Sequence, residues 1–133
     1  MYKRQDEREK LPQWHTDNIV LLSCSTYLNK LMIAYYLCDY DAAYEASVKG
    51  EEVISGGTGF IHNRHFNFYQ SLTLLARLGS ADAETRITHL EKIAENQERM
   101  AFWAQHCSAN NQNKYDLVAA ELARLDNLSL IHI

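Results

Sequence analysis

The stretch LEKIAENQERMAFWAQ, residues 90–105, decides the fold that this chain is expected to adopt. It contains neither glycine nor proline, and apolar residues recur along it at the spacing of one helical face: Leu90, Ile93, Ala94, Met100, Ala101 and Ala104. Charged residues occupy the other side, where Glu95 and Arg99 stand four positions apart in the favourable order for an ion pair. Because one amphipathic helix cannot bury its own apolar stripe, this helix requires helical neighbours.

Helical patterns on both sides supply those neighbours. The sequence predicts five helices: one that ends near residue 38, one over residues 42–54, one over residues 64–78, a long one over residues 83–106 that includes the quoted stretch, and one over residues 113–125. No alternating strand pattern of useful length occurs in the sequence. The predicted fold class is therefore all-α, an array of about five helices arranged as hairpins.

The first two helices are expected to form a hairpin around the turn Cys38-Asp39-Tyr40-Asp41, in which Asp41 would cap the second helix. The inner face of that second helix carries only small residues, which would let two helix axes approach closely: Ala43, Ala46, Ser47 and Gly50. This order resembles one tetratricopeptide-type hairpin, in which a GDYEKA-like turn sits at the same place. Cys38 stands where that hairpin usually has glycine.

Local signals set the expected ends and faces of the helices. Thr16 or Asp17 would cap the first helix, and Gly79 would end the third. Ser80 or Asp82 would open the fourth helix, with Asp82 paired to Arg86, and the polar run CSANNQ, residues 107–112, would separate the last two helices. The expected inward faces are Val20, Cys24, Tyr27, Leu31 and Ala34 in the first helix, Phe66, Tyr69, Leu72, Thr73 and Ala76 in the third, and Tyr115, Val118, Ala119, Leu122 and Leu125 in the fifth.

Composition restricts the classes of function that fit. The chain has 133 residues, enough for one domain, and 47% of them are hydrophobic, enough for a core. A formal net charge of −4 offers no basic surface for nucleic acid. Three cysteines without a CxxC pair predict reduced thiols and a cytoplasmic protein. No signal peptide is visible, and polar residues interrupt the most apolar long stretch, residues 19–38, so no membrane span is expected.

Both ends of the chain look like translated sequencing-library adapter. CTG TCT CTT ATA CAC ATC encodes the last six residues, LSLIHI. The reverse complement of that DNA contains GTG TAT AAG AGA CAG, which encodes the first five, MYKRQ, when GTG is the start codon. We therefore expect residues 1–5 and 128–133 to be adapter-derived, and residues 6–127 to be a helical repeat fragment of a longer reading frame. The alternative is a genuine basic N-terminus and a genuine apolar tail.

Possible catalytic, metal and phosphate sites are weakly supported. The run SGGTG, residues 55–59, is glycine-rich, but it lacks the Lys-Ser/Thr of a P-loop and follows a helix, which favours a flexible inter-hairpin loop. His62 and His65 could share a metal, although no third ligand is evident. His89 and His106 have polar neighbours and are expected at the surface or half-buried. Glu91, Glu95 and Glu98 alternate with basic residues, which favours a solvated face over a pair of catalytic acids. No catalytic, cofactor-binding or metal-ligating residue is predicted.

The chain is rich in aromatic residues, and most of them are expected in the core. Some could line a concave groove that receives a peptide or another domain, as helical repeats often do. The set comprises Tyr27, Tyr35, Tyr36, Tyr40, Tyr44, Phe66, Phe68, Tyr69, Phe102 and Trp103.

Three segments of the chain resemble a specific bacterial family. These are Asn-Phe-Tyr-Gln-Ser-Leu in residues 67–72, Asn-Gln-x-x-Met-x-x-Trp-Ala in residues 96–104, and Lys-Tyr-x-Leu-Val-x-Ala-Glu in residues 114–121. They are similar to segments in the tetratricopeptide-like helical region of large multi-domain signalling kinases, which combine a serine/threonine kinase, an AAA-type ATPase, GAF or PAS sensor domains and a histidine kinase. The upstream YYLCDYDAAYEAS looks like a hairpin of the same region, and the resemblance covers residues 27–125.

The resemblance implies a role in signal transduction without catalysis by this fragment. None of the family's kinase or ATPase catalytic residues maps onto this chain. The expected partners are proteins, either other domains of the parent chain or a signalling partner, and no cofactor, nucleic acid or membrane. Two alternatives stay open: a free-standing helical adaptor that binds peptides in an aromatic groove, and a small helical metal protein that uses His62 and His65.

Overall fold

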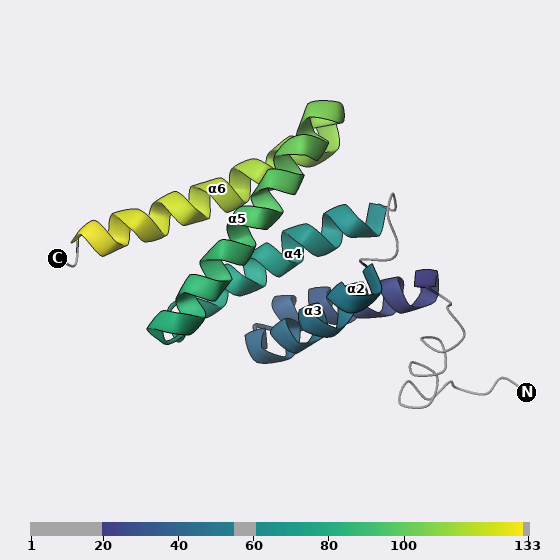
Figure 1. Cartoon of the computed structure of the whole chain (residues 1–133), viewed down its shortest axis with the longest axis horizontal. Helices are drawn as coiled ribbons and strands as arrows, with labels where there is room; N and C mark the ends of the chain where they lie inside the picture. Colours follow the sequence, from purple (N-terminus) through teal and green to yellow (C-terminus); the bar gives the residue numbers. More distant parts are fainter. Residues whose placement is uncertain (1–19, 55–60, 132–133) are drawn as a thin grey trace, which may run out of the picture.

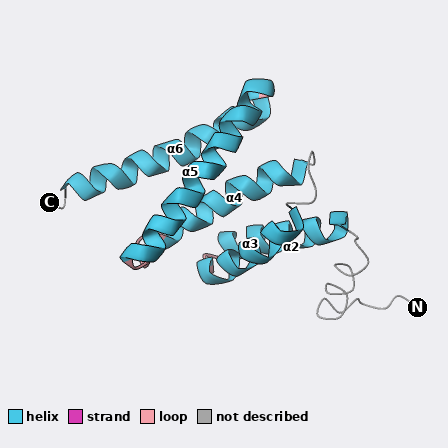
Figure 2. Ribbon diagram, viewed as in Figure 1, coloured by secondary structure: helices cyan, strands magenta, loops and turns pink. Residues whose placement is uncertain are grey.

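The chain folds into helices that the computed structural model describes over residues 20–54 and 61–131 (Figure 1). The helices are α2 (Val20–Tyr36), α3 (Tyr40–Ile54), α4 (Ile61–Arg77), α5 (Ala83–His106) and α6 (Ser108–Ile131). Figure 2 shows no strand in the described part, so the all-α prediction is confirmed. Over these residues no helix is both long enough and apolar enough to cross a membrane. The expected cap at Thr16 or Asp17 and the SGGTG run lie outside the described residues.

The helices pack in chain order, with α4 at the centre. Each helix contacts the next one along the chain, and α4 also contacts α2 and α6, so α4 touches all four other described helices. The N-terminal and C-terminal ends of the array lie on opposite sides (Figure 1). The core runs through the α2, α3, α4, α5 and α6 interfaces and is built mainly from Leu28, Leu31, Ala43, Ala46, Phe66, Tyr69, Leu72, Leu74, Leu75, Leu78, Ile93 and Val118.

The α2–α3 turn depends on an unusual backbone at Cys38. Cys38 has a φ of 61°, in the left-handed region. Its amide donates to the carbonyl of Tyr35 and the amide of Asp39 donates to the carbonyl of Ala34, at 3.0 and 2.9 Å. These two bonds form a Schellman motif, in which glycine usually takes the left-handed position. The predicted cap was wrong by two residues: α3 begins at Tyr40, and the Asp39 carboxylate accepts from the amide of Ala42 at 3.2 Å.

The small residues of α3 do allow a close approach, as predicted. Ala43, Ala46, Ser47 and Gly50 are all buried. A methyl group placed on Gly50 would lie 2.7 Å from Phe66 Cε2 in α4 and 3.0 Å from Tyr27 Cβ in α2. Such distances are shorter than van der Waals contact, so glycine is required where these three helices meet.

The buried face of α5 differs from the apolar stripe that the sequence suggested. The buried residues are His89, Ile93, Asn96, Met100 and Ala104, whereas Leu90 and Ala94 are exposed. Polar residues are buried because partners from α4 satisfy them: Asn96 Nδ2 donates to Gln70 Oε1 at 3.0 Å and to Ser71 Oγ at 3.2 Å. The stripe was misplaced because only apolar residues were assigned to the interior.

Between the last turn of α4 and the first turns of α5, one expected feature is present and three are not. Asp82 caps α5 by accepting from the amide of Thr85 at 2.7 Å, as predicted. The expected Asp82–Arg86 ion pair does not form, because Arg86 Nη1 donates to the Leu78 carbonyl at 3.0 Å. Helix α4 ends at Arg77, and Gly79 lies in the following turn without the left-handed backbone that a C′ glycine would supply. Ala76, expected to face inward, is exposed.

The reversal between α5 and α6 is much tighter than the polar run CSANNQ suggested. Only Cys107 is non-helical, and α6 begins at Ser108 rather than Asn113. The run was predicted to be a loop because it is polar, but in the structure its polar side chains stabilise the reversal. Asn111 Nδ2 donates to the carbonyls of Trp103 and Cys107, at 3.2 and 2.9 Å. On α6, Val118 is buried as predicted, and Leu122 and Leu125 pack against the core. Tyr115 and Ala119 are half-buried.

Candidate functional site

The residues weighed as metal ligands or acids do not assemble a reactive centre. Within the described ranges, no group of three or more His, Cys, Asp or Glu side chains could hold a metal ion. The side chain of His62 lies outside the described residues, and His65 lies in the wall of a pocket described below. Glu91, Glu95 and Glu98 are exposed, and Glu95 lies 3.7 Å from Arg99 and 3.9 Å from Lys92. The solvated acidic face and the Glu95–Arg99 pair are therefore confirmed.

His89 is fully buried, which contradicts the expectation that it lies at the surface or half-buried. Only 2% of the residue is exposed, and its ring lies 5.2 Å from the ring of Tyr44. On α4, the Arg77 guanidinium lies 3.9 Å from the centre of the same Tyr44 ring. Burial, with a smaller contribution from the nearby Arg77 charge, lowers the pKa of His89 below its ordinary value of 6.5. The histidine is buried because it packs on an aromatic ring as a neutral imidazole. His106, in contrast, is exposed beside Phe102.

Five aromatic side chains gather where α2 meets α3 and α4, and we call them the aromatic cluster: Tyr35, Tyr36, Tyr40, Phe68 and Tyr69. Ring centres lie 5.2–6.0 Å apart with mostly edge-to-face geometry, which is the favoured arrangement for aromatic pairs. Tyr36 and Tyr69 also share a hydrogen bond of 2.7 Å between their hydroxyl groups. The cluster therefore joins the first hairpin to α4.

The aromatic cluster is buried at one end and open at the other. Tyr69 is buried, and burial together with the Tyr36 hydroxyl raises the pKa of Tyr69 to about 12. Tyr36 is 66% exposed, next to Leu37, which is 75% exposed. Tyr27 and Phe66 lie in the core as expected, so only part of the aromatic set could contact a partner.

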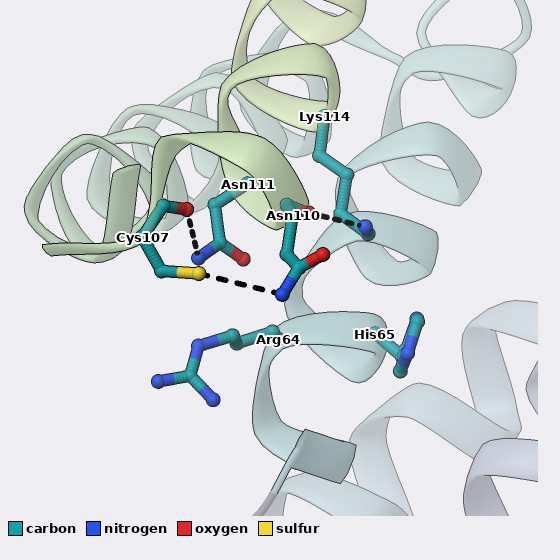
Figure 3. Close-up of a pocket in the computed structure, with 6 residues that line it drawn as sticks. All are labelled: Arg64, His65, Cys107, Asn110, Asn111 and Lys114. Carbon is teal, nitrogen blue, oxygen red and sulfur yellow. Dashed lines mark hydrogen bonds between the residues drawn. The ribbon is translucent and has the colours of Figure 1, made fainter. Parts of the chain in front are cut away.

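A basic pocket lies between the start of α4 and the α5–α6 reversal, and the sequence patterns gave no sign of it (Figure 3). It has a volume of about 250 Å³ and is lined by Arg64, His65, Cys107, Asn110, Asn111 and Lys114. Arg64 and His65 come from α4, and Asn110, Asn111 and Lys114 repeat along one face of α6. The spacing of the α6 residues was visible in the sequence, but Asn110 and Asn111 had been assigned to a loop and only Lys114 to a helix. Their meeting with α4 depends on the tertiary fold.

Comparison with known proteins adds no relative to this geometry: no protein-family model, no curated protein and no solved structure matches the chain.

Proposed function

We propose that this chain is a non-catalytic piece of a helical repeat scaffold, from the interior of the helical region of a multi-domain sensor kinase. The observation that carries the proposal is that apolar side chains are exposed in a stripe on α2 and in another stripe on α5. On α2 the stripe comprises Leu22, Ile33 and Tyr36, and it continues to Leu37 in the following turn. On α5 it comprises Ile87, Leu90 and Phe102, and Leu117 is exposed on α6. In a helical array, a terminal repeat normally presents a polar outer face, whereas an interior repeat presents apolar residues to its neighbours.

The order of helix packing supports the same proposal. Each described helix contacts the next one along the chain, and α4 also contacts α2 on one side and α6 on the other. Such contacts are expected of stacked helical hairpins, in which the first helix of one hairpin packs on both helices of the preceding hairpin. Further hairpins of the same parent polypeptide are the occupants that would cover the two apolar stripes.

The residues of the three resembling segments contact one another across the helices, which further supports the proposal. Asn96 of the second segment bonds to Gln70 and Ser71 of the first. Gln97 Nε2 donates to the carbonyl of Tyr115 in the third segment, at 3.1 Å. Met100 and Ala104 of the second segment and Val118 of the third are also buried. If the chain shares the helical framework of that family, the same residue types would be needed at these positions for packing rather than for a reaction.

The experiment tests whether the stripes are surfaces made to be covered. The unsubstituted chain should bind the dye ANS, and light scattering should show that it self-associates, because its apolar stripes are exposed to solvent. Replacing Ile33 on α2, Leu37 in the following turn, and Ile87 and Phe102 on α5 by lysine should give a monomer that unfolds with unchanged cooperativity. A matched control replaces the exposed Ala42, Ala76 and Ala123 by lysine. If the unsubstituted 133-residue chain were monomeric and bound no dye, the proposal would be overturned.

A free-standing peptide adaptor is the second candidate, and the aromatic cluster favours it. Tyr36, Tyr35 and Tyr40 place large rings at an open edge between hairpins, and tyrosine is enriched where proteins bind one another. This reading predicts a natural stop codon after residue 127 in the source DNA. Continuation of the reading frame into kinase, ATPase or sensor domains would instead support the scaffold.

A further inference from the structure

We infer that the basic pocket is a binding site for a small soluble phosphate monoester. The pocket gathers Arg64, His65 and Lys114 from two helices that are far apart in the sequence, and no carboxylate is among its lining residues. In Figure 3, Arg64 lies on the Cys107 side, while Lys114 and His65 lie on the opposite side, with Asn110 between them. The chain as a whole is acidic, with a net charge of −4, so a carboxylate-free basic pocket stands out against its surface.

The arginine and lysine of the pocket differ from most other arginines and lysines in the described part of the chain. Lys49, Arg77, Lys92, Arg99 and Arg124 each pair with a carboxylate. Within the described residues, no carboxylate lies within 4.0 Å of the Arg64 guanidinium or the Lys114 ammonium. Bringing such groups together without a counter-charge is unfavourable, and an anion bound between them would relieve the repulsion.

The neighbouring contacts hold these cations in place. The Arg64 guanidinium lies 5.6 Å from the centre of the Trp103 ring on α5. Lys114 Nζ donates to the carbonyl of Asn110 at 2.7 Å, and Asn110 Nδ2 donates to Cys107 Sγ at 3.3 Å. The guanidinium and the ammonium therefore stay at the pocket wall, and the pocket lies along the first two turns of α6, where the helix dipole also favours negative charge. Preorganised donors of this kind bind oxyanions better than free side chains do.

Pocket size and donor type select the class of ligand. A volume of about 250 Å³ is smaller than the roughly 300–1,000 Å³ of sites for drug-sized molecules, which indicates a small ligand. An arginine fork and an ammonium provide several charged donors for one group, and a phosphate monoester offers several terminal oxygens to receive them.

The test uses the whole 133-residue chain and phenyl phosphate as the probe, followed by amide chemical-shift titration. We expect saturable shifts confined to residues around Arg64 and the start of α6, which weaken as ionic strength rises. Lys114→Gln and Arg64→Gln should each reduce the affinity about tenfold or more, because each removes a charged donor. The matched control, Arg124→Gln, removes one exposed positive charge ten residues beyond Lys114 along α6 and should leave the affinity unchanged. Equal losses in all three variants, or no saturation, would overturn the proposal.

Further titrations separate the possible sources of the phosphate and do not depend on the stability of the variants. Phenyl phosphate should compete with inorganic phosphate, whereas neutral benzyl alcohol should not bind. Vesicles containing phosphatidic acid should give no more binding than phosphatidylcholine vesicles. Binding to phosphatidic acid alone would replace the soluble ligand by a lipid headgroup and contradict the inference. The alkylation rate of Cys107 by iodoacetamide should fall when phenyl phosphate is bound, while that of the exposed Cys38 should not.

Discussion

Cys38 carries a conformational cost that its neighbours compensate. A residue with a Cβ atom loses about 1–2 kcal/mol in the left-handed region, and glycine does not. The two Schellman hydrogen bonds and the Asp39 cap keep the turn in this geometry despite the cost. The turn between α2 and α3 is thus determined by the backbone bonding pattern rather than by the residue best suited to it.

Replacing Cys38 by glycine should stabilise the protein. We expect a gain of roughly 0.5–1 kcal/mol in the free energy of unfolding, because relief of the left-handed strain exceeds the extra entropy of glycine in the unfolded chain. Urea unfolding followed by circular dichroism measures the change. Cys38→Ala, which also removes the thiol but keeps a Cβ, is the control and should not stabilise. A loss of stability in Cys38→Gly would contradict the account of this turn.

His89 should make stability depend on pH. Its pKa is lowered in the folded state, so the unfolded chain binds more protons at mildly acidic pH. The stability that His89 contributes is complete above its unfolded pKa, near 6.5, and is lost as the pH falls below that value. Urea unfolding at several pH values between about 8 and 5 should show this loss, and His89→Phe should flatten it. His106→Gln, at an exposed site, should leave the profile as it is; an identical effect of the two substitutions would exclude His89 as the cause.

At the scale of the helices, Gly50 sets the distance between α3 and its neighbours. Alanine is the better helix former by about 1 kcal/mol, and Gly50 lies within α3. The added methyl group would nevertheless lie 2.7 Å from a ring atom of Phe66. Since Phe66 is itself buried, the ring cannot move aside without disturbing the core.

Gly50→Ala should therefore destabilise the protein, by about 1–3 kcal/mol of overpacking that exceeds the gain in helix propensity. Thermal unfolding by calorimetry gives the change directly. Gly79→Ala provides the comparison, because a Cβ at Gly79 has no atom within 4 Å, and it should be nearly neutral. If Gly50→Ala cost as much stability in a Phe66→Leu background as in the unaltered protein, contact with the Phe66 ring would not be the source of the loss.

Helix existence was predictable from the sequence, but the orientation of the helices was not. Five helices follow from periodicity and from few breakers, and the small face of α3 was recognisable because Ala43, Ala46 and Gly50 share one side. The rotation of α5 was missed because Asn96 and His89 are buried through partners on other helices, which hydrophobicity alone does not reveal. The basic pocket was missed for a similar reason: Arg64 and Lys114 are 50 positions apart, and only the packing of α4 on α6 joins them.

At the scale of the whole molecule, the helices form a stack with a shared centre rather than two separate hairpins. The aromatic cluster joins α2 to α4, and the Asn96 amide joins α4 to α5. Lys92 on α5 also forms an ion pair with Glu51 on α3, which links these two helices directly. Contacts thus extend beyond adjacent neighbours along the chain.

The position of α4 has a consequence for how the molecule opens. Since all four other described helices rest on α4, its amides can be released to solvent only when the whole stack separates, whereas the ends of α2 and α6 can fray on their own. Hydrogen–deuterium exchange should therefore find its slowest amides at Gln70–Leu75, with protection equal to the global free energy of unfolding. Faster exchange there than in α5 would mean that the two halves open independently. An array that exchanges as a single unit would transmit a pull on one end to the other without losing either half.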